Sequence, residues 1–183
     1  MSALRVARRY AAALLMLGKE QSVEDRLAED ARLVLEAGAQ SPQLRNLLKS
    51  PIIYRDKKDR ILRRLFEGKV HDITLRFIRI MLRKRREAYL LDAFRQYVEL
   101  YKAAKKIADV LVVLPTPADA PLMESLERWL RTLPPLQDKQ RLNVRTVADE
   151  AIIGGVMTEF EGYKLDRSVR TQLERFKKAF SLS

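Results

Sequence analysis

The spacing of apolar residues changes once along this chain, close to residues 105–109. Before that point apolar residues recur every three or four positions, as in Leu90, Phe94 and Tyr97, which is the period of a helix that buries one face. After it comes Val110–Leu114, a short β-branched run closed by Pro115, which is typical of a buried strand. The sequence therefore predicts an α+β protein that is helical first and mixed afterwards.

The 183 residues are enough for two small domains, and we expect a boundary between residues 106 and 107. Residues 1–106 are expected to form a six-helix bundle, and residues 107–183 a small α/β domain. The first helix is expected at Ser2 to Lys19, the second starts after Ser22 as its N-cap, and the third starts at Pro42. The fourth includes Ile61 to Phe66, the fifth runs from Ile73 to Arg85, and the sixth from Leu90 to Ala108. In the second domain we expect a helix from Pro121, a strand over Leu142 to Thr146, a hairpin turn at Glu161-Gly162 and a last helix.

Positive charge is concentrated in the first half of the chain. The formal net charge is +12, and residues 1–105 hold 24 Lys and Arg against 13 Asp and Glu. The density is highest in Arg55–Arg86, with 13 basic and 4 acidic residues. Such a surface favours encounter with an acidic partner. The charge alone does not distinguish a protein from a nucleic acid or a lipid head group.

The composition excludes several kinds of site. The chain has no Cys and one His, which excludes disulfides, Cys-ligated zinc, iron–sulfur clusters and thiol nucleophiles. Glycine-rich phosphate-binding motifs are absent, and Gly154-Gly155 fits a tight turn or a close backbone approach at a strand start. His71 is expected to cap a helix or to be exposed. We therefore predict no catalytic residue, no metal site and no cofactor, and hence no enzyme.

No stretch of the sequence approaches the roughly 20 apolar residues that a membrane-spanning helix needs. We therefore expect a protein without a direct membrane span.

Two helices of the first half are apolar on more than one face. On the first helix, Val6, Tyr10, Ala13, Leu14 and Leu17 share one sector, and a second sector is also apolar. On the fifth, Arg76, Arg79 and Arg83 form the single polar stripe. Such a helix is either central in a bundle or keeps one face for a partner, for example an amphipathic helix in a groove. The pattern alone leaves both interpretations open.

Three segments, in order along the chain, carry a family resemblance. Val6–Leu14 is similar to the family's opening helix, and Phe77–Leu82 to a segment of its fifth helix. Ile153–Leu173 contains its closing signature, Ile-Gly-Gly followed by Leu-Asp-Arg-Ser-Val. Over essentially its whole length the chain resembles the delta subunit of rotary ATP synthases, the counterpart of the mitochondrial oligomycin-sensitivity-conferring protein. It departs at Lys84-Arg85-Arg86, where the family commonly has Asn-x-Arg and only the final Arg is kept.

The resemblance implies a non-catalytic stator connector, present in one copy per complex. Such a protein links the alpha/beta catalytic head to the peripheral b-subunit stalk, so that the head does not turn with the rotor. It would be peripheral on the cytoplasmic face of the bacterial cell membrane. The helical domain would bind the N-terminal helix of an alpha subunit between its first and fifth helices, and the second domain would meet the b subunits.

The resemblance also suggests which residues line that groove. Tyr10 and Ala13 on the first helix and Ile80 on the fifth are carried over from the family's motifs. Val6, Leu14 and Leu17 are added because they share the same helical face.

A second hypothesis is a nucleic-acid-binding protein that uses the basic Arg55–Arg86 region. The run Arg83-Lys84-Arg85-Arg86 is the strongest candidate for such a site. No aromatic-laced strand motif or other nucleic-acid-binding signature accompanies it, so the stator interpretation leads to the expectation that nucleic acid is not a partner.

Overall fold

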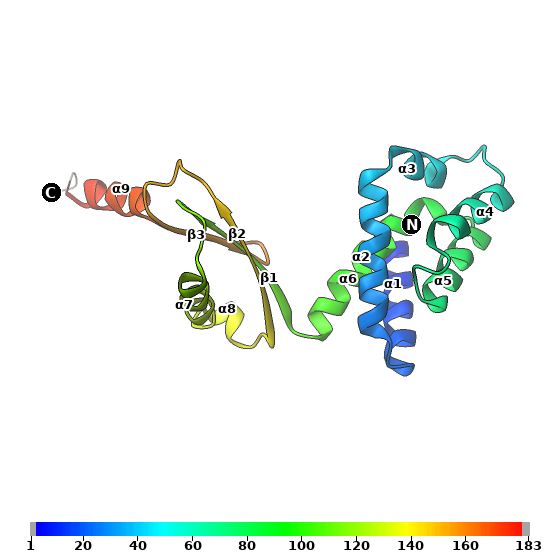
Figure 1. Ribbon diagram of the computed structural model, residues 1–183, viewed down its shortest axis with the longest axis horizontal. Helices are drawn as coiled ribbons and strands as arrows, with labels where there is room; N and C mark the ends of the chain where they lie inside the picture. Colours follow the sequence, from blue (N-terminus) through cyan, green and yellow to red (C-terminus); the bar gives the residue numbers. More distant parts are fainter. Residues whose placement is uncertain (1–2, 181–183) are drawn as a thin grey trace. The chain divides into compact units, whose positions relative to one another are not determined.

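The chain divides into two compact units, which separate between Lys102 and Ala103. The computed structural model in Figure 1 describes residues 3–180, so the expected helix start at Ser2 lies outside the described residues. The first unit is helical, and the second contains a four-stranded sheet with helices. The predicted α+β class, helical first and mixed afterwards, is confirmed.

The first unit is a set of helices joined by short turns. Its elements are α1 (Ala3–Glu20), α2 (Glu24–Gln40), α3 (Pro42–Lys49), α4 (Arg55–Phe66), α5 (Asp72–Arg83), the 3-10 turn η1 (Glu87–Tyr89) and α6 (Leu90–Ala104). Ser41 caps α3, since its hydroxyl accepts a hydrogen bond from the backbone N–H of Leu44, and Pro42 follows at the first helical position. His71 caps α5 in the same way, because its Nδ1 accepts from the N–H of Ile73.

Two predicted helix boundaries are wrong, and in both places a residue with positive φ is the reason. Ser22 has φ of 54°, and the N–H of Val23 bonds to the carbonyl of Gly18, so Ser22 ends α1 instead of capping α2. Lys106 has φ of 52°, and α6 ends at Ala104. Ala108 is therefore a buried residue of the first strand and not the end of the sixth helix stripe.

Phe77 of α5 lies at the centre of the first unit. Its ring contacts the edge of Tyr10 from α1 at 6.3 Å and that of Phe94 from α6 at 5.3 Å, measured between ring centroids. Such edge-to-face aromatic pairs stabilise beyond the area that they bury. Tyr97 of α6 donates its hydroxyl proton to the carbonyl of Glu24 at 3.0 Å. Burial raises the pKa of Tyr97 far above its ordinary value, so the hydroxyl stays a donor.

The second unit is a mixed sheet with helices on one face. Its elements are β1 (Ile107–Leu114), α7 (Ala120–Leu130), α8 (Pro134–Gln137), β2 (Arg141–Ala148), β3 (Gly155–Phe160), β4 (Tyr163–Ser168) and α9 (Val169–Phe180). The strand order is β2-β1-β3-β4, with β1 and β2 parallel and the other neighbours antiparallel. The predicted hairpin turn at Glu161-Gly162 is confirmed, and both residues have positive φ.

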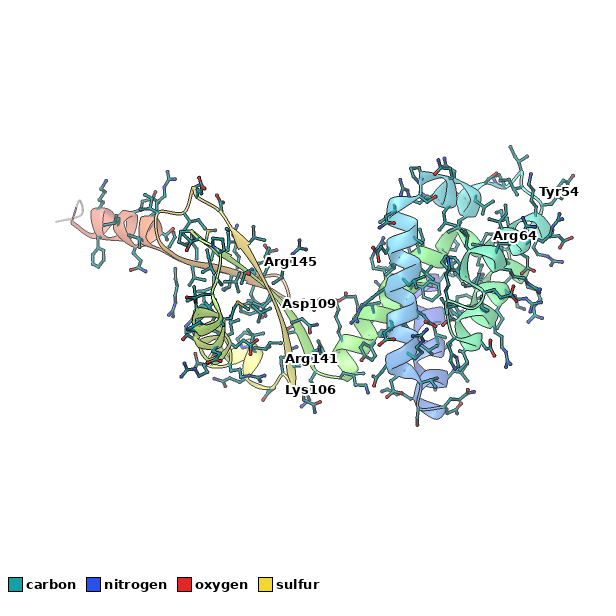
Figure 2. All side chains as sticks on the ribbon, in the orientation of Figure 1. Tyr54, Arg64, Lys106, Asp109, Arg141 and Arg145 are labelled. Carbon is teal, nitrogen blue, oxygen red and sulfur yellow. The ribbon has the colours of Figure 1, made fainter. Side chains whose placement is uncertain are left out.

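The alternation of side chains along β1 separates a core face from a polar face. Ala108, Val110, Val112 and Leu114 pack with Leu126, Leu130, Leu136 and Phe160, which places α7 and α8 over this face (Figure 1). On the opposite face Asp109 accepts a hydrogen bond from its register partner Asn143 at 2.9 Å. Figure 2 shows Lys106, Asp109, Arg141 and Arg145 along β1 and β2.

No helix of the described residues is a candidate for a membrane span. Among residues 3–180, none combines the length and the apolar character that crossing a bilayer requires.

Gly155 begins β3 where the strand passes very close to β4. Its φ is +85°, and a Cβ placed there would collide with the carbonyl oxygen of Arg167 and lie 2.9 Å from the Cα of Ser168. The interpretation of Gly154-Gly155 as a close backbone approach is thereby confirmed. Gly162 has a similar φ of +84° but no atom within 4 Å of such a Cβ.

These two glycines separate backbone strain from steric collision. We expect Gly162→Ala to lower the free energy of unfolding by about 1–2 kcal/mol, the strain of a left-handed alanine. Gly155→Ala adds a clash with the β4 backbone, so its loss is expected to be larger by at least about 2 kcal/mol. Urea unfolding followed by circular dichroism measures both. Equal losses would show that β3 and β4 do not approach as described.

Candidate partner-binding surface

The six predicted groove residues differ widely in exposure. On α1, Val6 and Leu14 are 8% and 3% exposed and belong to the core. Leu17 is 38% exposed, Ala13 is exposed, and Tyr10 lies between these extremes. The sequence placed all five on one face but could not show how far the neighbouring helices cover it. A partner on this side of α1 therefore has Tyr10, Ala13 and Leu17 to contact, with Val6 and Leu14 beneath them.

Tyr10 is held between two other parts of the first unit. One edge of its ring faces Phe77 of α5 at 6.3 Å, and the guanidinium of Arg86 lies 5.6 Å from its ring centroid. A cation over an aromatic face is an attractive contact, and here it joins α1 to the segment that follows α5. The ring is therefore fixed in position while part of it stays accessible.

Most apolar side chains of α5 are buried within the first unit, and one remains exposed. Ile73, Phe77, Ile78, Met81 and Leu82 are all buried, so most of the helix is central in the unit. Ile80 is the large apolar residue of α5 that stays exposed, at 38%, and it borders a hollow shared with α4. Ile80 is thus the large apolar side chain of α5 that a partner can reach. It lies about one helical turn after Phe77, which contacts Tyr10.

Arg86 is part of this surface although the sequence did not predict it. Helix α5 ends in a Schellman-type cap, in which the N–H of Arg86 bonds to the carbonyl of Met81 and that of Arg85 to the carbonyl of Leu82. Arg85 takes the left-handed position with φ of 54°, which turns the chain and brings Arg86 over Tyr10. The available signal was the final Arg of the Asn-x-Arg pattern, which this chain keeps.

Asp59 and His71, two titratable residues near α5, are engaged in structural contacts. Within the described part of the chain no cluster of three or more His, Asp or Glu could hold a metal ion. The Asp59 carboxylate is engaged by Arg63 at 3.0 Å and by Arg79 at 3.6 Å. His71 uses its ring nitrogen as a helix cap.

The basic Arg55–Arg86 region contains α4 and α5, and one of its cations is buried inside the first unit. Lys58 is 1% exposed, and its Nζ donates to Glu87 at 2.7 Å and to the carbonyl of Leu48 at 3.4 Å. A buried ammonium without these partners would be strongly unfavourable. Figure 2 labels Arg64 of this region and Tyr54, which immediately precedes the region.

The cap of α5 yields a prediction about stability. Replacing Arg85 with glycine removes the strain of a left-handed side chain, so Arg85→Gly should raise the free energy of unfolding by about 0.5–1 kcal/mol. Arg83→Gly, inside the last helical turn, should instead lower it by about 1 kcal/mol. Thermal unfolding of both variants tests this, and a loss of stability in Arg85→Gly would contradict the described cap.

Comparison with known proteins gives a consistent result over nearly the whole chain. The model of the family described as ATP synthase delta (OSCP) subunit matches residues 6–180. The ATP synthase subunit delta of Salinibacter ruber is 35% identical and aligns with 94% of this chain and 89% of its own length. That of Chlorobium phaeobacteroides is 32% identical, with 98% and 97% covered.

A solved structure shows the same fold. A chain in the cryo-EM structure of the Toxoplasma gondii mitochondrial ATP synthase hexamer superposes with a TM-score of 0.68 at 19% identity, covering 95% of this chain and 96% of that one. Of the two functions predicted from sequence, these relatives favour the stator connector. The chain belongs to the ATP synthase delta (OSCP) subunit family, a peripheral-stalk component of the ATP synthase.

Proposed function

We propose that this chain connects the alpha/beta catalytic head of the ATP synthase to the b-subunit stalk without catalysing any step itself. In this proposal helices α1–α6 act as one six-helix bundle, residues 1–106, that binds the head, and residues 107–183 bind the stalk. One copy per complex lies at the cytoplasmic face of the bacterial membrane. Family membership supports the setting, and the exposed apolar residues described below support the two contacts.

The partner of the first unit is the amphipathic N-terminal helix of an alpha subunit. The observation that carries this assignment is the strip formed by Tyr10, Ala13 and Leu17 on α1, with Ile80 on α5. Leu17 and Ile80 each keep 38% of their surface exposed, on the two helices that the Tyr10–Phe77 contact joins. An amphipathic helix that lays its apolar side on such a strip buries residues that otherwise remain in water.

The strip makes a sharp prediction at Leu17. Leu17→Asp places a charge in the apolar contact and should weaken binding of the alpha-subunit peptide by at least about thirtyfold, as at an interface hot spot. Leu17 is exposed, so the fold should survive, whereas Tyr10→Asp would also disturb the packing of Phe77. Isothermal titration with a synthetic peptide copying the alpha-subunit N-terminal helix of the same organism measures the effect.

Met16 provides the matched control. It is 71% exposed, adjacent in sequence and about 100° away around α1, so Met16→Asp adds the same charge outside the strip. Its binding constant should stay within about threefold of that of the unaltered chain. If both variants bind equally well, or both lose binding, the strip is not the site.

The stalk contact is placed on α9, which extends from the end of β4. Val169, Leu173 and Phe176 are 40%, 54% and 60% exposed, and their spacing puts them on one helical face. A row of large exposed apolar side chains on one helix is typical of a protein contact. We assign this face to the b subunits.

The α9 assignment is tested by a pair of variants that introduce the same charge. Leu173→Asp should reduce co-purification of b subunits with the tagged protein from mild-detergent extracts of its own membranes at least about tenfold. Gln172→Asp, at an exposed position about 100° around α9 from Leu173, should leave recovery unchanged. Alpha subunit should be recovered with both variants, and loss of b subunit with Gln172→Asp alone would refute the assignment.

A further inference from the structure

Helices α4 and α5 border an open hollow of about 520 Å³, and the proposed function uses this hollow only at Ile80. Arg55, Asp56 and Asp59 reach it from α4. The contribution of α5 is Arg76, Arg79, Ile80, Leu82 and Arg83. The volume is within the range of sites that accept several side chains or a small ligand.

The hollow carries more positive charge than its own acids neutralise. The Asp59 carboxylate is shared by Arg63 and Arg79, and Asp56, whose side chain is 89% exposed, lies 3.9 Å from Arg55. With the residues that the structure describes, Arg76 and Arg83 make no ion pair. Their guanidinium groups lie about two turns apart on the same side of α5. Both are therefore available to an anion from outside.

The same hollow has an apolar part. Ile80, with 38% of its surface exposed, supplies its aliphatic surface, and Leu82 of the same lining is only 2% exposed. A ligand that fills the hollow thus meets guanidinium groups and an aliphatic surface together. This combination fits a carboxylate next to an apolar side chain better than it fits a purely ionic ligand.

The charge of the surrounding region points in the same direction. Arg55–Arg86 holds 13 basic residues against 4 acidic ones, and like charges this close repel one another in the free protein. An acidic ligand relieves that repulsion. Asp56 and Asp59 within the lining would in turn repel a phosphodiester backbone, whereas a peptide can direct its few carboxylates at Arg76 and Arg83.

We propose that the α4–α5 hollow binds an acidic protein segment that carries an apolar residue between its carboxylates. The carboxylates pair with Arg76 and Arg83, and the apolar residue covers Ile80. This contact lies on the α4 side of α5 and shares Ile80 with the proposed alpha-subunit strip, whereas Arg76 and Arg83 belong to the hollow alone. It gives the high positive charge of this chain a specific role in assembly.

The proposal is tested on the full chain by fluorescence anisotropy at near-physiological salt. The probe is a short labelled peptide of Glu-Glu-Leu repeats, compared with Gln-Gln-Leu and Glu-Glu-Ser repeats of equal length. We expect saturable binding of the first peptide and at least about tenfold weaker binding of the Gln peptide. The Ser peptide should bind more weakly than the Leu peptide, because it cannot cover Ile80.

Charge-reversal variants locate the site. The double variant R76E/R83E should weaken binding of the Glu-Glu-Leu peptide at least about tenfold. R32E/R131E changes the net charge by the same amount at two exposed positions outside the hollow and should bind within about twofold of the unaltered chain. Urea unfolding of both variants confirms that they remain folded. Leu17→Asp should bind the acidic peptide normally, which separates this proposal from the α1 strip.

Several results would overturn the proposal. One is the absence of saturable binding by the unaltered chain, and another is an equal loss in R76E/R83E and R32E/R131E, which would reduce the effect to net charge. A third is tighter binding of single-stranded DNA or of anionic phospholipid vesicles than of the peptide, with that binding lost in R76E/R83E. That result would assign the hollow to phosphate ligands.

Discussion

The buried carboxylate of Asp30 fixes the N-terminus of α5, and the arrangement of the first unit depends on where α5 lies. Asp30 is 1% exposed, and its Oδ2 accepts hydrogen bonds from the N–H of His71 and the hydroxyl of Thr74, each at 2.7 Å. A negative group is favourable there because the first N–H groups of a helix lack partners and the helix dipole is positive. With its start tied to α2, α5 holds Phe77 against Tyr10, which gives the proposed alpha-subunit strip its rigid base.

The two ends of α5 serve different purposes in this scheme. The start is fixed by Asp30, whereas the end turns sharply at Arg85 and returns Arg86 to the ring of Tyr10. Between them the helix buries its apolar faces and leaves a row of arginines on the α4 side. One helix therefore borders both an apolar strip and a cationic hollow, with Ile80 common to the two, and each surface suits a different partner chemistry.

Sequence reasoning succeeded where the local signal was strong. Ser41-Pro42 marked the start of α3, Glu161-Gly162 marked a hairpin, and Gly154-Gly155 marked a close approach, and all three are present. It failed at Ser22 and at Ala108. The helices before them end through Ser22 and Lys106, which take a left-handed conformation in place of glycine, and such ends have no clear sequence signal. The strand order β2-β1-β3-β4 was likewise not predictable, because pairing is decided by contacts between distant segments.

By itself the sequence determined the class of fold, the concentration of positive charge and the helical face shared by Val6, Tyr10, Ala13, Leu14 and Leu17. These follow from periodicity and composition, which are local properties of the chain. Only the tertiary structure decided that Val6 and Leu14 are buried while Leu17 and Ile80 stay exposed, and that Arg76 and Arg83 share a hollow. The physical reason is that exposure depends on which neighbouring helices cover a face, and that is fixed by packing between residues far apart in sequence.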